Sequence, residues 1–297
     1  MNSETARDPA RERLIGYACG VGIVLIWTGF ILSARAGMKG TLGSLDLAAL
    51  RFTVSGLVML PFYLLHARKV IPFRRAAALA LVAGLAYANL AYAGFKYAPA
   101  AHGGVLLPGA LPIWTAILAV FVLHERLNLA RVASLAIVLA GIVMIGWHGF
   151  AGAQPGAWRG DLIFLCASLC WATYTVLVRK WRVPAIPATA AVAVLSAVAF
   201  LPVYAVALPS RLAAASWGEI AFQAVYQGIF AVVIAGILFT RAVGALGAGT
   251  ATMITAVIPA TAALAAVPLL DEPLSPLALA GVVAVSAGMI LGVRAAH

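Results

Sequence analysis

The sequence predicts an all-α integral membrane protein of ten transmembrane helices, built as two inverted five-helix repeats. The first observation is composition: the 297 residues are 64% apolar and only 10% charged, with a mean hydropathy of +1.04. That balance excludes an ordinary water-soluble globular protein. The second is a series of apolar runs long enough to cross a bilayer. The third is a set of spacings in the first half of the chain that recurs in the second.

A bilayer core about 30 Å thick requires roughly 20 apolar residues in helical conformation. Ten runs of that kind lie near residues 14–34, 46–66, 75–95, 100–123, 129–147, 161–179, 187–208, 217–239, 248–270 and 274–293. We expect the first run to be a retained helix and not a signal peptide, because its apolar core is too long and acidic residues precede it. The links are short, so function is expected within the helices and their turns.

Lys and Arg predict the orientation, because cytoplasmic loops carry the excess of positive charge. Over alternate connections, one side of the membrane carries fourteen of these residues and the other carries five. We therefore expect both termini in the cytoplasm. Arg51 lies within the second run and is left out of this count. We interpret it as a structural residue that snorkels outward or bonds carbonyl groups.

The internal repeat is independent of hydropathy. Pro112 precedes Glu125 by thirteen residues, and Pro259 precedes Glu272 by the same number. Glu272 follows Glu125 by 147 residues, and Gly288 follows Gly141 by the same number.

A Trp near the start of each half, Trp27 and Trp171, repeats at an offset of 144, so a three-residue indel separates the two registers. The expected units are residues 1–153 and 154–297. Five spans per unit is an odd number, so the second unit must enter the membrane from the opposite side, as in many secondary transporters.

With these elements the sequence resembles the drug/metabolite transporter superfamily, in its ten-helix EamA-type branch. The resemblance runs through the Pro112 to Leu127 segment and Gly141, and again through Pro259, Glu272, Leu274 and Gly288. It implies a bacterial inner-membrane exporter of amino acids or related metabolites, with a central cavity between the halves. Pro273 departs from the pattern, because the first copy has Arg there.

Deep ionisable residues are the usual pointers to mechanism in a membrane protein, and no Asp or Glu lies near the middle of a predicted span. Small multidrug antiporters carry a carboxylate in the first helix, where this chain has Trp27 and Thr28. We therefore expect a neutral or zwitterionic solute, such as an amino acid, moved by alternating access. A carrier for multidrug or cationic efflux is the alternative within the same class.

Polar and aromatic side chains at helical spacing are the candidates for substrate binding, in a cavity open to the periplasm. They are Trp27, Asn89, Tyr92, His102, Trp114, Trp171, Tyr174, Gln223, Tyr226 and Gln227. The alternative is that they are interhelical hydrogen-bonding groups and interfacial aromatics. His102 either couples transport to protons or bonds a neighbouring carbonyl group.

Three further expectations are structural. Glu125 and Glu272 stand just before helices, where a carboxylate can cap exposed N–H groups. Prolines 108, 112 and 259 should kink the fourth and ninth helices. Gly288 and Gly292 should allow close packing of the last helix against the fifth or a second subunit.

Other classes of function lack their residues. No nucleophile with a base, paired buried carboxylates or zinc-ligand spacing is present, so we expect no enzyme, no metal and no cofactor. An intramembrane enzyme or a channel is the rival from a different class. The basic residues form no continuous patch, so no nucleic acid is expected. The expected partners are the lipid bilayer and a small-molecule substrate, with the chain as a monomer or homodimer.

Overall fold

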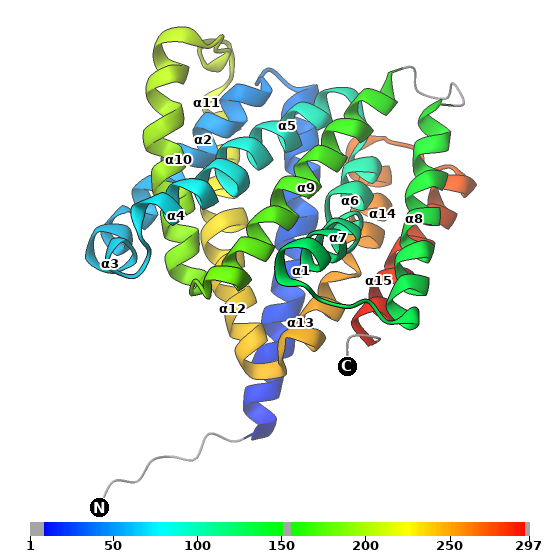
Figure 1. Ribbon diagram of the computed structural model, residues 1–297. Coiled ribbons are helices and arrows are strands. Elements are labelled where there is room, and N and C mark those ends of the chain that lie inside the picture. Colours follow the sequence, from blue (N-terminus) through cyan, green and yellow to red (C-terminus); the bar gives the residue numbers. More distant parts are fainter. Residues whose placement is uncertain (1–8, 151–155, 295–297) are drawn as a thin grey trace, which may run out of the picture.

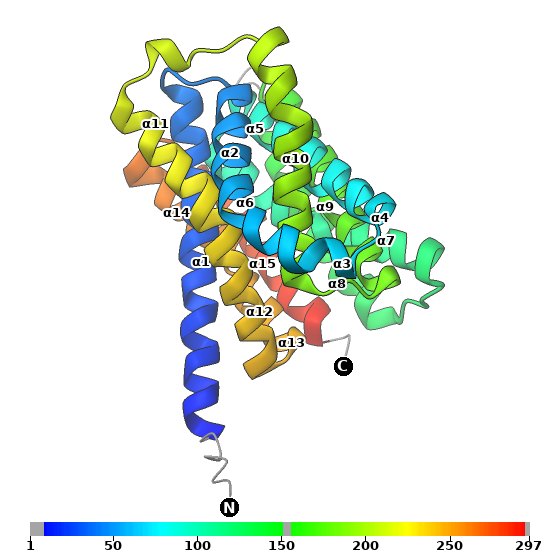
Figure 2. The same cartoon turned by 90° about the vertical axis from the view of Figure 1, so that its left-hand side faces the viewer.

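The computed structural model describes residues 9–150 and 156–294 as a bundle of helices (Figures 1 and 2). Within these ranges, ten helices are long and apolar enough to cross a membrane, which confirms the predicted number of spans. The predicted boundary between the units, at residues 153 and 154, lies outside the described residues.

Each of the first five spans is made of one, two or three helical elements joined end to end. Their elements are α1 (Pro9–Lys39), α2 (Ser44–Phe62), η1 (Tyr63–Ala67), α3 (Arg68–Val70), α4 (Phe73–Leu79), η2 (Ala80–Ala86), α5 (Tyr87–Tyr97), α6 (Ala100–Gly109), α7 (Leu111–Leu123) and α8 (Leu129–Phe150).

The second five spans follow the same plan, with one short helix, η3, in the link before the eighth span. The elements are α9 (Ala157–Trp181), α10 (Ala185–Ala207), η3 (Leu212–Ala214), α11 (Trp217–Ala224), η4 (Val225–Ile234), α12 (Ala235–Leu246), α13 (Ala248–Thr255), α14 (Ile258–Leu270) and α15 (Pro276–Arg294). The first and eighth spans are 30 residues each, longer than predicted. Their ends are held together, because Arg241 Nη2 lies 2.7 Å from Glu12 Oε2.

The first and last helices place both chain ends on one side of the bundle (Figure 1). We call this side the terminal face and the opposite side the far face. Helix α1 runs from the terminal to the far face, and α9, which begins the second half, runs the other way (Figure 1). The halves are therefore inverted with respect to each other.

The fourth and ninth spans are broken at equivalent positions, as their prolines predicted. Helix α6 ends at Gly109 and α7 begins at Leu111, while α13 ends at Thr255 and α14 begins at Ile258. Proline at the second position of α7 and of α14 lacks the N–H that a continuous helix would need there. Each break lies near the middle of its span, and the residues at the breaks, Ala110 and Val257, keep right-handed helical dihedral angles.

The fifth and tenth spans, α8 and α15, form the tightest contact between the halves. A Cβ at Gly141 would lie 2.6 Å from the carbonyl oxygen of Gly281, and one at Gly288 would lie 2.9 Å from the backbone nitrogen of Val138. Glycine therefore lets the two backbones touch. The partner of Gly288 and Gly292 is the fifth helix of the same chain.

Candidate functional site

The far face is closed by a buried ion pair that joins the two halves. Arg35, near the end of α1, places Nε 2.6 Å from Glu272 Oε1, in the turn after α14. Its Nη1 donates to the carbonyl oxygen of Phe95 at 2.5 Å, and the N–H of Ala100 donates to Glu272 Oε2 at 2.7 Å. Glu272 is only 7% exposed. This one carboxylate thus connects α1, α6 and α14.

The prediction that Glu125 and Glu272 cap the helices that follow them was wrong. Those helices receive their side-chain caps from Asn128, which accepts the N–H of Arg131 at 2.8 Å, and from Ser275, which accepts the N–H of Ala278 at 3.1 Å. The shorter side chains stand nearer to the helix starts and fill the role first. Glu272 instead accepts the first N–H of α6, a helix from the other half.

The terminal face carries the counterpart of the far-face pair. Arg179 follows Arg35 by 144 residues and Glu125 precedes Glu272 by 147, the two offsets of the repeat. Arg179 Nη2 lies 2.5 Å from Glu125 Oε1. The side chains here are 52% and 32% exposed, so water screens this pair much more than the buried one.

A second buried pair lies behind the far face. His102 Nδ1, in the first turn of α6, lies 2.7 Å from Asp161 Oδ1, in the first turns of α9. The two residues are 3% and 6% exposed, and Asp161 Oδ2 has no hydrogen-bond partner. The partner of His102 is thus a carboxylate and not the backbone carbonyl that was one expectation. The hydrogen bond between His102 and Asp161 is therefore shielded from water.

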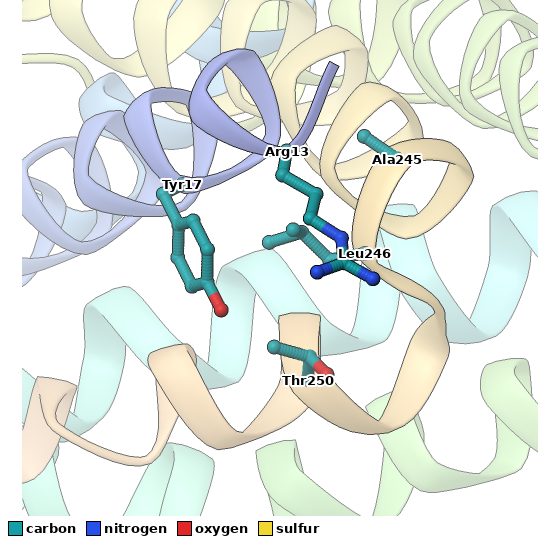
Figure 3. Close-up of a pocket in the computed structure, with 5 residues that line it drawn as sticks. All are labelled: Arg13, Tyr17, Ala245, Leu246 and Thr250. Carbon is teal, nitrogen blue, oxygen red and sulfur yellow. The ribbon is translucent and has the colours of Figure 1, made fainter. Parts of the chain in front are cut away.

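The terminal face has a cavity at the position equivalent to that of the His102 and Asp161 pair. A cavity of about 240 Å³ lies between α1 and the junction of α12 and α13 (Figure 3). Its walls include Tyr17 and Thr250, and Arg13 reaches into it from α1 (Figure 3). Tyr17 precedes Asp161 by the 144-residue offset. The terminal face therefore has a cavity at the place where the far face has the hydrogen bond between His102 and Asp161.

At mid-depth the halves meet through hydroxyls and aromatic rings. Thr28 Oγ1 lies 2.6 Å from Thr261 Oγ1, joining α1 to the start of α14 just after the break. Trp171 lies with its ring centroid 4.7 Å from that of Tyr87 and 5.2 Å from that of Tyr174. The indole Nε1 of Trp114, just after the other break, is buried without a hydrogen-bond partner. It is a donor available to a solute at this depth.

Three predicted binding residues instead form a closed cluster. Tyr92 Oη donates to Gln227 Oε1 at 2.9 Å, and Gln227 Nε2 donates to Ser33 Oγ and to Gln223 Oε1. Gln223 Nε2 donates in turn to the carbonyl oxygen of Ser33 at 2.7 Å. The tyrosine and both glutamines are at most 2% exposed. In this structure they link helices and do not open toward the far face, because their polar groups satisfy one another.

The remaining predicted residues are spread around these groups. Trp27 packs on Phe239 of α12. Tyr226 lies between two phenylalanine rings of its own span and donates to the carbonyl oxygen of Ile26. Asn89 donates to the carbonyl oxygen of Leu85, and its Oδ1 is buried without a partner. Among the predicted residues, Asn89 and Trp114 are therefore the ones with a buried polar atom that has no hydrogen-bond partner.

Comparison with known proteins now places this architecture. The model of the EamA-like transporter family matches residues 14–147 and again residues 158–294. The chain belongs to the EamA-like transporter family. It is therefore a multi-pass membrane transporter, and the two matched segments correspond to the two inverted halves.

Relatives of this EamA-like transporter support the same conclusion. The uncharacterized transporter YyaM of Bacillus subtilis (strain 168) is 27% identical over 69% of this chain and 71% of its own. The uncharacterized transporter YetK of the same organism is 27% identical over 67% of this chain and 62% of its own. A solved crystal structure, 21% identical, shares the fold with a TM-score of 0.62 over 95% of this chain and 96% of its own. That last likeness concerns the fold alone.

Several residues that build the site of this EamA-like transporter were not among the predicted ones. From the sequence, Arg35 and Arg179 were interpreted only as signals of topology, and Asp161 only as a residue at the start of a helix. One signal could have found the ion pairs: each arginine and each glutamate recurs at the offset of the repeat, 144 for the arginines and 147 for the glutamates. Inversion of the halves then requires Arg35 and Glu272 to share one face and Arg179 and Glu125 the other.

Proposed function

We propose that this chain is a bacterial inner-membrane secondary transporter that exports a small neutral or zwitterionic metabolite, such as an amino acid, by alternating access. Both termini lie in the cytoplasm in this proposal. The terminal face is then the cytoplasmic face and the far face the periplasmic one.

The observation that carries the proposal is the pair of equivalent ion pairs, Arg35 with Glu272 and Arg179 with Glu125. Each arginine belongs to one half and its glutamate to the other, so each pair closes one membrane face across the boundary between halves. A carrier needs one closure on each side of its binding site, and an inverted repeat supplies two of the same construction. Between them, Pro112 and Pro259 each remove one helical hydrogen bond at the breaks, near mid-depth.

A carrier for cationic drugs finds less support. Such carriers bind their cargo at a carboxylate near the membrane centre. In the part of the chain that the structure describes, the two most buried carboxylates after Asp46 already have side-chain partners: Asp161 contacts His102 and Glu272 contacts Arg35. Asp46 accepts hydrogen bonds from Tyr204 and from backbone N–H groups near the far face. None is left for a cationic solute.

The test is uptake of labelled amino acids by proteoliposomes that contain the purified chain, with protein-free liposomes as the control. Saturable uptake that is stimulated by unlabelled amino acid on the opposite side would support a carrier. A conductance that does not saturate would support a channel, and absence of movement for the whole panel would contradict amino acid export.

Orientation is tested separately, by labelling of single cysteines with a membrane-impermeant maleimide in intact cells. Cysteines that replace Lys96 and Arg211 should react, and those that replace Arg68 and Arg126 should react only after lysis. The opposite pattern would contradict cytoplasmic termini.

A further inference from the structure

Arg51 is a buried cation within the membrane, and it takes part in neither of the two equivalent ion pairs. It lies seven residues into the second span, so its Cα is about 10 Å below the far face. The residue is 9% exposed, and its Cζ lies 5.6 Å from the centroid of the Phe30 ring on α1. The expectation that Arg51 snorkels to the surface is therefore not met, because its side chain is covered by protein.

No described carboxylate lies within ion-pair distance of Arg51. The nearest carboxylate along its own helix, Asp46, accepts hydrogen bonds from Tyr204 and the N–H groups of Gly43 and Arg211. Transfer of a guanidinium from water into a protein interior is costly unless an anion compensates it. The aromatic face of Phe30 offsets only part of that cost. Arg51 thus contrasts with the buried Glu272, whose partner is Arg35, and with Asp161, whose partner is His102.

The surroundings of Arg51 lead toward the boundary between the halves. The Phe30 ring that the guanidinium faces lies with its centroid 6.1 Å from that of Tyr92 on α5. The Tyr92 hydroxyl donates to Gln227 Oε1, in the second half, at 2.9 Å. A buried positive charge without a described carboxylate partner therefore stands beside aromatic rings that lead to the boundary between the halves.

We propose that Arg51 binds the carboxylate of the transported solute. The inference rests on the proposed transport function and specifies its substrate class: a small solute with a carboxylate group and an apolar or aromatic remainder. The planar fork of a guanidinium matches the two oxygens of a carboxylate, and this pairing is strong where water is excluded. The Phe30 ring beside the guanidinium contacts the remainder of the solute.

The experiment uses full-length protein in proteoliposomes and compares each L-amino acid with its own primary amide, for example phenylalanine with phenylalaninamide. The two differ in the carboxylate. We expect the acid to compete with labelled amino acid at a concentration about 10-fold or more below that of the amide, as for a hydrogen bond to a charged group. A wild-type preference for the amide, or equal competition, would overturn the inference while saturable transport still supported the proposed function.

Substitutions then assign the preference to Arg51. In Arg51→Gln we expect KM for the acid to rise about 10- to 100-fold and the preference over the amide to vanish, whereas Arg51→Lys should keep a weakened preference. Arg75→Gln is the matched control, because Arg75 also lies 5.6 Å from an aromatic centroid, that of Trp181, but is exposed. A folded Arg51→Gln that keeps the acid preference would overturn the inference.

A binding measurement covers the case in which transport is not observed or Arg51→Gln does not fold. The thermal unfolding temperature of the wild type and of Arg51→Lys is recorded in detergent with the same acids and amides. Stabilisation of the wild type by acids alone, reduced in Arg51→Lys, supports the inference. Equal stabilisation by amides, or none by any acid, contradicts it. Loss of transport with this binding retained would contradict the proposed function alone.

Discussion

The two faces of the bundle are built from equivalent residues but are not equally closed. At the far face, the side chains of Arg35 and Glu272 are only 16% and 7% exposed, and they share hydrogen bonds with Phe95 and Ala100. At the terminal face, the equivalent Arg179 and Glu125 form one exposed contact. The residue equivalent to Ala100 is Gly247, whose N–H bonds Val243 of its own helix and not the glutamate. The difference lies in the third partner, the start of the broken helix.

The helix contacts beside these pairs repeat the asymmetry. A Cβ at Gly160 would meet Ala98 at 2.5 Å, and one at Gly16 would meet Ala245 at 2.9 Å, so equivalent residues touch in both halves. Next to them the far face has the His102 and Asp161 pair, while the terminal face has the cavity at Tyr17 (Figure 3). A repeated sequence thus supports one tight and one loose end, as a carrier between two states requires.

Glu272→Gln should have the largest effect on this comparison. It removes one partner of a buried ion pair and leaves Arg35 uncompensated, at an expected cost of about 3–5 kcal/mol to the closed far face. The measurement is the rate at which a cysteine at position 100 reacts with a maleimide, which should rise. An unchanged rate would show that the pair does not hold the far face closed.

His102→Gln should have the next largest effect. The loss of the hydrogen bond to the buried Asp161 carboxylate should lower stability by about 1.5–3 kcal/mol, measured by thermal unfolding in detergent. If the pair also carries a coupled proton, the pH dependence of transport should flatten in this variant. Transport that keeps its pH dependence would exclude His102 from coupling and leave it a structural role.

Gly288→Ala tests the region where the halves are alike. Its new Cβ would lie 2.6 Å from Val138 Cγ2 and 2.9 Å from the Val138 nitrogen, so α8 and α15 must separate, at about 1–3 kcal/mol. Gly141→Ala, its equivalent, should cost a similar amount. Gly146→Ala is the control, because a Cβ there meets nothing within 4 Å. Unequal costs would place part of the asymmetry in this packing.

Glu125→Gln should have the smallest effect, about 0–1 kcal/mol, because its ion pair with Arg179 is exposed. Thermal unfolding of this variant beside Glu272→Gln measures the difference between the faces directly. Equal losses in the two variants would mean that burial does not distinguish the pairs and would contradict the comparison.

The spans and their breaks could be predicted from the sequence because they depend on local properties. Apolar length determines where a helix can cross, and the ring of Pro112 or Pro259 removes a hydrogen bond wherever it stands. Side-chain partners could not be predicted in the same way. Arg35 and Glu272 are separated by 237 residues, and their contact depends on how the halves dock. Glu272 was therefore assigned to the helix beside it in sequence.

The candidate site shows the same division. Tyr92, Gln223 and Gln227 were selected correctly as inward-facing polar residues, but periodicity could not tell whether they face a solute or each other. Their hydrogen bonds, together with those to Ser33, join three different spans. Arg51 was expected to reach the surface because a flexible side chain can do so from that depth. The ring of Phe30 on a neighbouring helix holds it inside.

The third span of each half has a π-helical stretch, η2 over seven residues and η4 over ten. A π turn contains more residues than an α turn. Each stretch could therefore convert to α-helix and change the rotation and length of its span. Tightening η4 by one residue would rotate the part of the span beyond it by about 100° about the helix axis. Tyr226 and Gln227 lie inside that stretch, so the same rotation would break their hydrogen bonds to α1. The stretches η2 and η4, in the third span of each half, thus give the bundle a way to change shape while its helices stay folded.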